Sequence, residues 1–139
     1  MTAFIDSSVL VAAIVATEPH HAECSQLLDS EPVGMYPHGL TETFSTLTGG
    51  RRQFRMPASV AAAVLAEDYA PCLAFAALTP NEMLRALSES ESRGVQGGAI
   101  FDYLHLVAAR KAKAAKIYTL NVSNFRAFHR PGDPEIAHP

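Results

Sequence analysis

Short apolar runs alternate along this chain with longer segments in which apolar residues recur every three or four positions. The short runs are typical of buried strands, and the longer spacing is typical of helices that pack on a core. The runs predict strands within residues 2–5, 32–37, 73–78, 117–120 and 135–138. The spaced segments predict helices over residues 9–16, 18–29, 38–48, 56–65, 80–92 and 99–110. Strands that alternate with helices in this way predict one α/β sandwich with a mainly parallel sheet.

Length and composition agree with a single domain over residues 1–139. A chain of 139 residues can bury one substantial core, and 48% hydrophobic with 18% charged residues is ordinary for a globular protein. The two cysteines lack the CxxC spacing of a zinc site. There is no apolar stretch long enough to span a bilayer and no signal peptide pattern at the N-terminus, so we expect a cytoplasmic protein without a membrane association.

The segment 97–110 carries the first candidate for chemistry. Gly97 and Gly98 are typical of a loop that leads into a helix, and Asp102 falls in the first turn of that helix. A carboxylate there is stabilised by the positive end of the helix dipole. Asp102 by itself is therefore consistent either with a helix-start acid or with a functional residue.

Two further polar groups follow predicted strands, and a third lies on a predicted helix. Asp6 could cap the helix after the first strand, but Ser7 and Ser8 can do so without a charge, which favours a functional role for Asp6. Glu42 lies at the edge of the apolar face of its helix, and Asn121 follows the strand at 117–120. If that strand pairs with the first one, these side chains and that of Asp102 converge at one edge of the sheet.

Crowded carboxylates need a compensating cation, because their mutual repulsion otherwise raises their pKa values. Mg²⁺ or Mn²⁺ prefers oxygen ligands, and such an ion can activate water as a nucleophile and neutralise charge on a phosphodiester. The net charge is −3, yet seven of the 11 Lys and Arg residues fall in two short runs, 51–55 and 110–116. Such runs can hold phosphates, although solvated helix faces are a commoner explanation. The combination suggests hydrolysis of a nucleic-acid backbone.

Four segments carry a more specific signal: residues 4–10 (FIDSSVL), 40–47 (LTETFSTL), 101–109 (FDYLHLVAA) and 117–121 (IYTLN). In their order and spacing they resemble the successive motifs of a PIN domain, particularly the VapC-type toxins of bacterial toxin–antitoxin pairs. The resemblance implies a PIN-like three-layer sandwich with a mainly parallel central sheet flanked by helices. It also implies a Mg²⁺-dependent endoribonuclease, a hydrolase acting on RNA. The family is usually homodimeric and is kept inactive by a small VapB-type antitoxin whose C-terminal segment occupies the active-site groove.

By this resemblance, Asp6, Glu42 and Asp102 are the expected catalytic and metal-coordinating acids. The family often has a fourth acid just after the last strand, where this chain has Asn121. An amide oxygen can still ligate a metal or hold a water, but it brings no charge, so a second metal would be held more weakly.

The remaining expected site residues assist these acids or the substrate. Ser8, Thr119 and Asn124 are expected to support the ligands without binding the ion. His105, one turn after Asp102, is expected to pack or to form a hydrogen bond rather than act as a base, because an ion-activated water needs no histidine. Contacts to RNA or antitoxin are expected from three basic residues: Arg51, Arg52 and Arg110. Arg110 is equally consistent with a solvated helix face.

Other functions fit the pattern less well. Phosphatases of the haloacid-dehalogenase type also begin with a strand that ends in Asp, but they need a second Asp two positions on, where this chain has Ser8. A receiver domain needs paired acids that are absent here. The alternative function is a metal-poor PIN-like module that binds RNA or a protein partner without cleaving. Asn121 favours that alternative, and the three acids favour catalysis.

Overall fold

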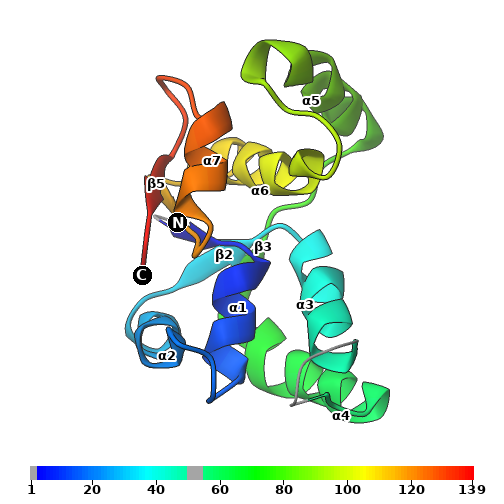
Figure 1. The fold of residues 1–139 in the computed structure, drawn as a ribbon, viewed down its shortest axis with the longest axis vertical. Helices are drawn as coiled ribbons and strands as arrows, with labels where there is room; N and C mark the ends of the chain where they lie inside the picture. The colour runs from blue at the N-terminus through cyan, green and yellow to red at the C-terminus, as the bar shows by residue number, and fades with distance from the viewer. Residues whose placement is uncertain (1–2, 50–54) are drawn as a thin grey trace.

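A computed structural model describes residues 3–49 and 55–139, in which five short strands form one sheet between two layers of helices (Figure 1). The strands are β1 (Ala3–Ile5), β2 (Val33–Met35), β3 (Leu73–Phe75), β4 (Lys116–Tyr118) and β5 (Glu135–Ala137). Their order in the sheet is β3-β2-β1-β4-β5, and each neighbouring pair is parallel. The predicted α/β sandwich with a mainly parallel sheet is confirmed.

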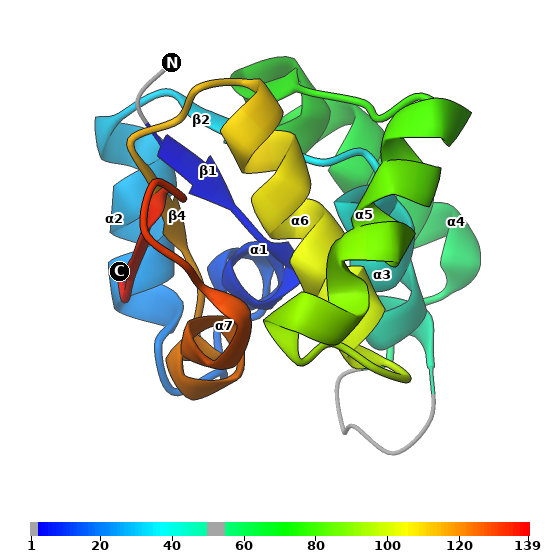
Figure 2. The ribbon, with the colours of Figure 1, turned by 90° about the horizontal axis from the view of Figure 1, so that it is seen from above.

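Helices cover both faces of the sheet (Figure 1). One layer holds α1 (Ser7–Ile14), α2 (His21–Ser30), α3 (His38–Thr48) and α4 (Ala58–Ala63), after which the chain continues as a π-helix (Val64–Tyr69) and a 3-10 turn (Ala70–Cys72). The other layer holds α5 (Pro80–Arg93), α6 (Ala99–Lys111) and α7 (Val122–Phe128). Figure 2 shows α5 alongside α6. No helix in the described part of the chain combines the length and hydrophobicity needed to cross a membrane.

The central strand β1 is apolar at every position because both of its faces are buried. Phe4 packs into the core between the sheet and α6, where its neighbours include Leu106 and Ile117. Ile5 points into the opposite core together with Leu10 of α1. All five of these side chains are fully buried. Successive side chains of a strand alternate between faces, so a strand covered on both sides shows as one continuous apolar run.

The pairing of β1 with β4 decides where the functional residues meet. Ile5 of β1 lies opposite Tyr118 of β4, and the Asp6 backbone N–H donates to the Tyr118 carbonyl at 3.3 Å. The condition stated from the sequence, that the strand near residues 117–120 neighbours the first strand, is therefore met. The carboxyl ends of both strands open at the same edge of the sheet, next to the N-terminus of α1.

Two predicted helix starts are wrong in detail. The cap of α1 is Asp6 and not a serine, since the Asp6 side chain accepts from the Val9 backbone N–H. The second helix begins at His21, later than the predicted start at residue 18. Glu18 instead lies in the preceding turn, where its backbone N–H donates to the Val15 carbonyl at 3.1 Å. The later start of α2 leaves Glu18 in a turn, beside the segments that follow β1 and β4.

Candidate active site

Asp6 is held rigidly at the junction of β1 and α1. One carboxylate oxygen accepts from the Ser8 hydroxyl at 2.6 Å and from the Val9 N–H at 3.3 Å, and the other accepts from the Thr119 hydroxyl at 2.7 Å. Only 1% of the residue is exposed. Burial raises the pKa of Asp6, although the charge of His105 and these hydrogen bonds oppose the shift. A buried carboxylate with fixed orientation is costly, so it is a strong candidate for function.

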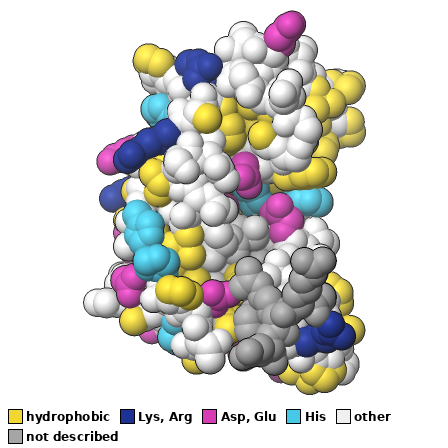
Figure 3. All heavy atoms as spheres, viewed as in Figure 1, with side chains coloured by type: hydrophobic (Ala, Val, Ile, Leu, Met, Phe, Trp, Pro, Cys, Tyr) yellow, Lys and Arg dark blue, Asp and Glu magenta, His cyan; other side chains and the backbone are white. Residues whose placement is uncertain are grey.

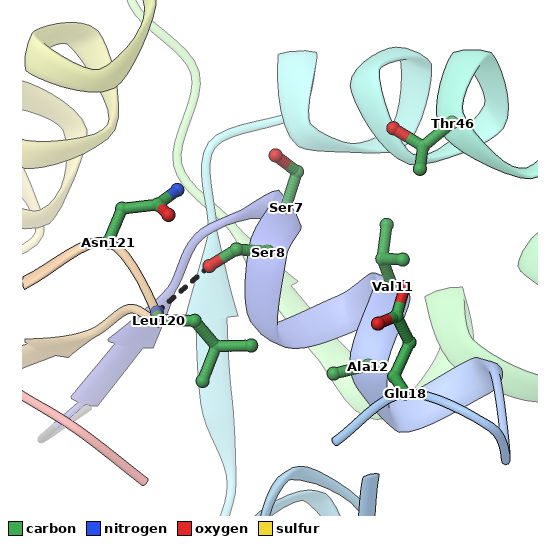
Figure 4. A pocket seen from close by; sticks show the side chains of 8 residues that line it. All are labelled: Ser7, Ser8, Val11, Ala12, Glu18, Thr46, Leu120 and Asn121. Atoms are coloured by element: carbon green, nitrogen blue, oxygen red, sulfur yellow. Dashed lines mark hydrogen bonds between the residues drawn. The ribbon is translucent and has the colours of Figure 1, made fainter. Parts of the chain in front are cut away.

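Hydrogen bonds join the end of β1 to the segment after β4. The Ser8 hydroxyl oxygen accepts from the Leu120 N–H at 3.0 Å, as Figure 4 shows, while the Thr119 hydroxyl oxygen accepts from the Asn121 N–H at 2.9 Å. Each hydroxyl therefore accepts one bond from the backbone and donates one to Asp6. Ser8 and Thr119 thereby orient the Asp6 carboxylate and the backbone beside it.

Asp102 lies in the first turn of α6 and is half-buried. Its pKa is raised to about 6, first by burial, next by the negative charge of Asp6 and also by that of Glu42, while His105 acts in the opposite direction. Favourable placement at a helix N-terminus would lower the pKa of a carboxylic acid. The opposite shift indicates that burial, together with the charges of the neighbouring acids, outweighs the helix dipole at Asp102.

Glu42 reaches the site from α3 and is paired with a buried histidine. Its carboxylate oxygen lies 2.5 Å from His105 Nε2, and the His105 side chain is fully buried. The Tyr36 ring meets the His105 ring edge-on at 5.6 Å. His105 Nδ1 has no hydrogen-bond partner within the described residues. The expectation that His105 packs or forms a hydrogen bond is confirmed, and its partner is one of the three candidate acids.

A polar pocket of about 320 Å³ opens between the start of α1 and the segment after β4 and is lined by Ser8 and Leu120 (Figure 4). Its wall includes Ser7, Thr46, Asn121 and Glu18. Sequence reasoning missed Glu18, because it treated an acid before a proline as the start of a helix. The side chain of Asn121 forms no cap on α7. Asn124 lies exposed one turn further along α7 and is not among the residues lining this pocket.

The basic residues expected to contact RNA or antitoxin divide into two groups. Arg51 and Arg52 lie outside the described residues. The Arg110 guanidinium is partly buried and donates to Glu89 at 3.2 Å and to Asp133 at 3.3 Å. Arg93 also pairs with Asp133. These ion pairs tie α6 to α5 and to the C-terminal loop, so Arg110 is neither a freely solvated helix residue nor an unengaged phosphate contact.

The donor set at this edge fits a hard divalent cation. Figure 3 shows acidic and histidine side chains together on the face between α3 and α6. Among the described residues, no group of three or more His, Cys, Asp and Glu side chains is arranged so that it could hold a metal ion. Mg²⁺ does not require one, because it keeps several waters and uses one or two carboxylates. Asp6 and Asp102 carry carboxylate oxygens whose mutual repulsion such an ion would relieve, and Glu42 adds a third negative charge nearby.

Comparison with known proteins gives two similarities in sequence. Residues 3–129 match the family described as PIN domain. The chain is also 31% identical over 110 residues to Ribonuclease VapC27 of Mycobacterium tuberculosis (strain ATCC 25618 / H37Rv). That similarity covers 79% of this chain and 78% of the relative.

Solved structures share the fold at lower identity. One is VapC20 of Mycobacterium tuberculosis, described as a Sarcin-Ricin loop cleaving toxin, with a TM-score of 0.72, 21% identity and coverage of 96% of this chain and 100% of that chain. Another is VapBC2 of Rickettsia felis bound to a DNA fragment from its promoter, with a TM-score of 0.68, 15% identity and coverage of 100% and 99%. These likenesses show the same arrangement of strands and helices.

Proposed function

This chain belongs to the PIN domain family, and from that membership we propose that it is a VapC-type endoribonuclease that hydrolyses RNA phosphodiester bonds with Mg²⁺ or Mn²⁺. The resemblance found in the sequence motifs is confirmed by the family match over residues 3–129 and by the 31% identity to Ribonuclease VapC27. One observation carries the proposed chemistry. The pKa of Asp102 is raised by burial and then by the charges of Asp6 and Glu42, so three acids from distant parts of the chain share one electrostatic environment.

We propose that Asp6 and Asp102 hold the ion and that Glu42 completes the acidic site. When bound, the ion would polarise a water for attack on phosphorus and neutralise the charge that develops on the phosphodiester. Ser8 and Thr119 keep the Asp6 carboxylate in one orientation through bonds of 2.6 and 2.7 Å. His105 holds Glu42 at the site's edge. Asn121, exposed beside the polar pocket, would contribute an amide oxygen without adding charge.

The partners proposed for this chain rest on the same family membership and on complexes formed by proteins of the same fold. Structures that share this fold include VapBC2 of Rickettsia felis and a toxin–antitoxin complex of Klebsiella pneumoniae, the second with a TM-score of 0.67. We propose that a small VapB-type antitoxin inhibits this chain, that the active form is a homodimer, and that the enzyme acts on RNA in the cytoplasm. Arg51 and Arg52 stay candidate contacts to RNA or to the antitoxin.

The test is cleavage of total RNA by the purified protein, in Mg²⁺, in Mn²⁺ and in EDTA, with the new 5′ ends mapped. Asp6→Asn and Asp102→Asn keep the shape of each side chain and remove its charge, so both are expected to lose cleavage while they stay folded by circular dichroism. Asp29→Asn, at an exposed acid on α2, is the matched control and is expected to cut normally.

The result separates the two functions considered from the sequence. Discrete cuts that require both the ion and the acids would establish a metal-dependent nuclease. RNA binding without cuts under either ion would refute it and support the non-cleaving module instead. Cleavage that survives in EDTA or in both Asn variants would refute the proposed roles of the acids.

A further inference from the structure

An exposed pair of stacked aromatic rings lies beside the acidic site. The rings of His38 and Phe101 are 5.7 Å apart at their centroids and within 15° of parallel. His38 begins α3, and Phe101 lies in the first turn of α6, directly before Asp102. Phe101 is 49% exposed, whereas most other aromatic rings in the described part of the chain are buried or half-buried.

The ring pair forms one wall of a shallow hollow of about 440 Å³ that also includes Glu42, one of the three candidate acids. The other lining residues are Thr41, Ser45 and Glu42. Glu42 is the carboxylate that pairs with His105 and acts on the pKa of Asp102. The hollow and the acidic site therefore share the side chain of Glu42, so a molecule seated in the hollow would lie next to the proposed metal-binding acids.

The chemistry of the hollow selects a base rather than a phosphate. Its described lining residues include no Lys or Arg, and Glu42 would repel a phosphate. A flat aromatic face, with hydroxyls at its rim, matches the way unpaired RNA bases stack on Phe, Tyr, Trp or His and form hydrogen bonds along their edges. A paired base cannot offer its face in this way, because both of its faces are stacked within the helix.

We propose that the His38–Phe101 ring pair is a stacking site for an unpaired nucleobase that flanks the bond to be cut. This inference rests on the proposed endoribonuclease function and adds to it a place on this chain where one unpaired base beside the cut is held. Phe101 is then a specificity-determining residue: it selects exposed bases and positions the adjacent phosphodiester against Asp102. An apolar side chain of an antitoxin is the competing occupant, and the experiment below separates the two.

The probe is a short single-stranded oligoribonucleotide of alternating uridine and 2-aminopurine, a base whose fluorescence is quenched when it stacks. Binding is measured in Mg²⁺ in the Asp102→Asn background, so that the RNA stays intact. We expect binding to quench the fluorescence. Phe101→Leu, which keeps an apolar side chain but removes the ring, is expected to abolish the quenching and to weaken affinity about tenfold. The same probe annealed into a duplex is expected to bind poorly and without quenching.

Two variants provide controls. Leu84→Ala, at a 62% exposed apolar residue of α5, is expected to leave both affinity and quenching unchanged. Phe101→Trp keeps a ring and introduces an indole into a chain that has no tryptophan. Its fluorescence is expected to fall when unlabelled single-stranded RNA binds. This readout does not depend on Phe101→Leu being folded.

Unchanged affinity and quenching in a folded Phe101→Leu protein would overturn the stacking site, as would an indole signal that RNA does not alter. Normal RNA binding by Phe101→Leu together with weakened binding of a VapB-type C-terminal peptide would also overturn it, in favour of the antitoxin. Failure of the nuclease function itself has a different signature, which is the absence of metal-dependent cuts by the unmodified protein. Base quenching that depends on Phe101 would support the stacking site in that case too.

Discussion

The charge of Asp102 is expected to destabilise the metal-free fold, and Asp102→Asn is expected to stabilise it. The folded protein raises the pKa of this carboxyl from its ordinary value of 3.8 to about 6. A difference of that size corresponds to about 3 kcal/mol at pH values above both pKa values. Because Asp102 is only half-buried, solvent screens part of this penalty. We therefore expect a gain of about 1–2 kcal/mol for the Asn variant.

The direction of the pH dependence follows from proton binding. A raised pKa means that the folded state holds the Asp102 proton more tightly than the unfolded state does. The contribution of Asp102 to stability is therefore most favourable below about pH 4, declines as the pH rises toward 6, and stays unfavourable above that value. The advantage of Asp102→Asn should be small near pH 4 and full at pH 8.

Urea denaturation in EDTA at pH 5 and pH 8 measures this difference, with Asp29→Asn as the exposed-acid control. Adding Mg²⁺ should reverse the order of stability, because an ion bound by the acids stabilises only the protein that retains them. If the main interaction of the Asp102 charge were its favourable one with the dipole of α6, Asp102→Asn would instead be less stable than the unmodified protein at pH 8, by about 0.3–1 kcal/mol. That result would refute the reasoning from the acidic cluster.

Two further changes test the support of the site and of the fold separately. Thr119→Val removes the hydroxyl that donates to buried Asp6 at 2.7 Å, so urea denaturation should show a free energy of unfolding lower by about 1–3 kcal/mol. Thr119→Ser keeps the hydroxyl and should retain most of this stability. Equal stability of the two variants would contradict the role of the hydroxyl. Burial acts to raise the pKa of Asp133, but its bonds to Arg93, to the Arg130 backbone and to Arg110 outweigh burial and lower it. Its stabilising effect is thus complete above pH 3.8 and lost as the pH falls through the lower folded value. Asp133→Asn should lower the free energy of unfolding by about 2 kcal/mol at pH 7, which is less than for a fully buried pair because the arginines are partly exposed. RNA cleavage should stay intact in this variant. A loss of cleavage in the folded variant would place this network of ion pairs in the active site.

Local signals in the sequence were sufficient for most of the secondary structure. The apolar run of β1, the spacing of α3 and the Thr79 cap of α5 each depend on residues within a few positions of one another. The cap is a full capping box with Glu82. Such signals act before the chain is folded, so they can be recognised from the order of residues alone. They were misleading at the start of α1, where serine and aspartate are both good caps and the tertiary surroundings select Asp6.

The meeting of the functional groups was decided by the tertiary structure. Asp6 and Thr119 are neighbours because β1 pairs with β4, and Glu42 meets His105 because α3 and α6 approach each other from opposite layers. The sequence alone determined which acids lie at the ends of elements, and the family motifs indicated that they belong together. It could not show that Arg110 is engaged with Glu89 and Asp133, or that Phe101 stacks on His38 in the open. Those contacts join residues far apart in the chain. They form, and contribute to stability, only after the sheet has assembled and brought the helices on either side of it into place.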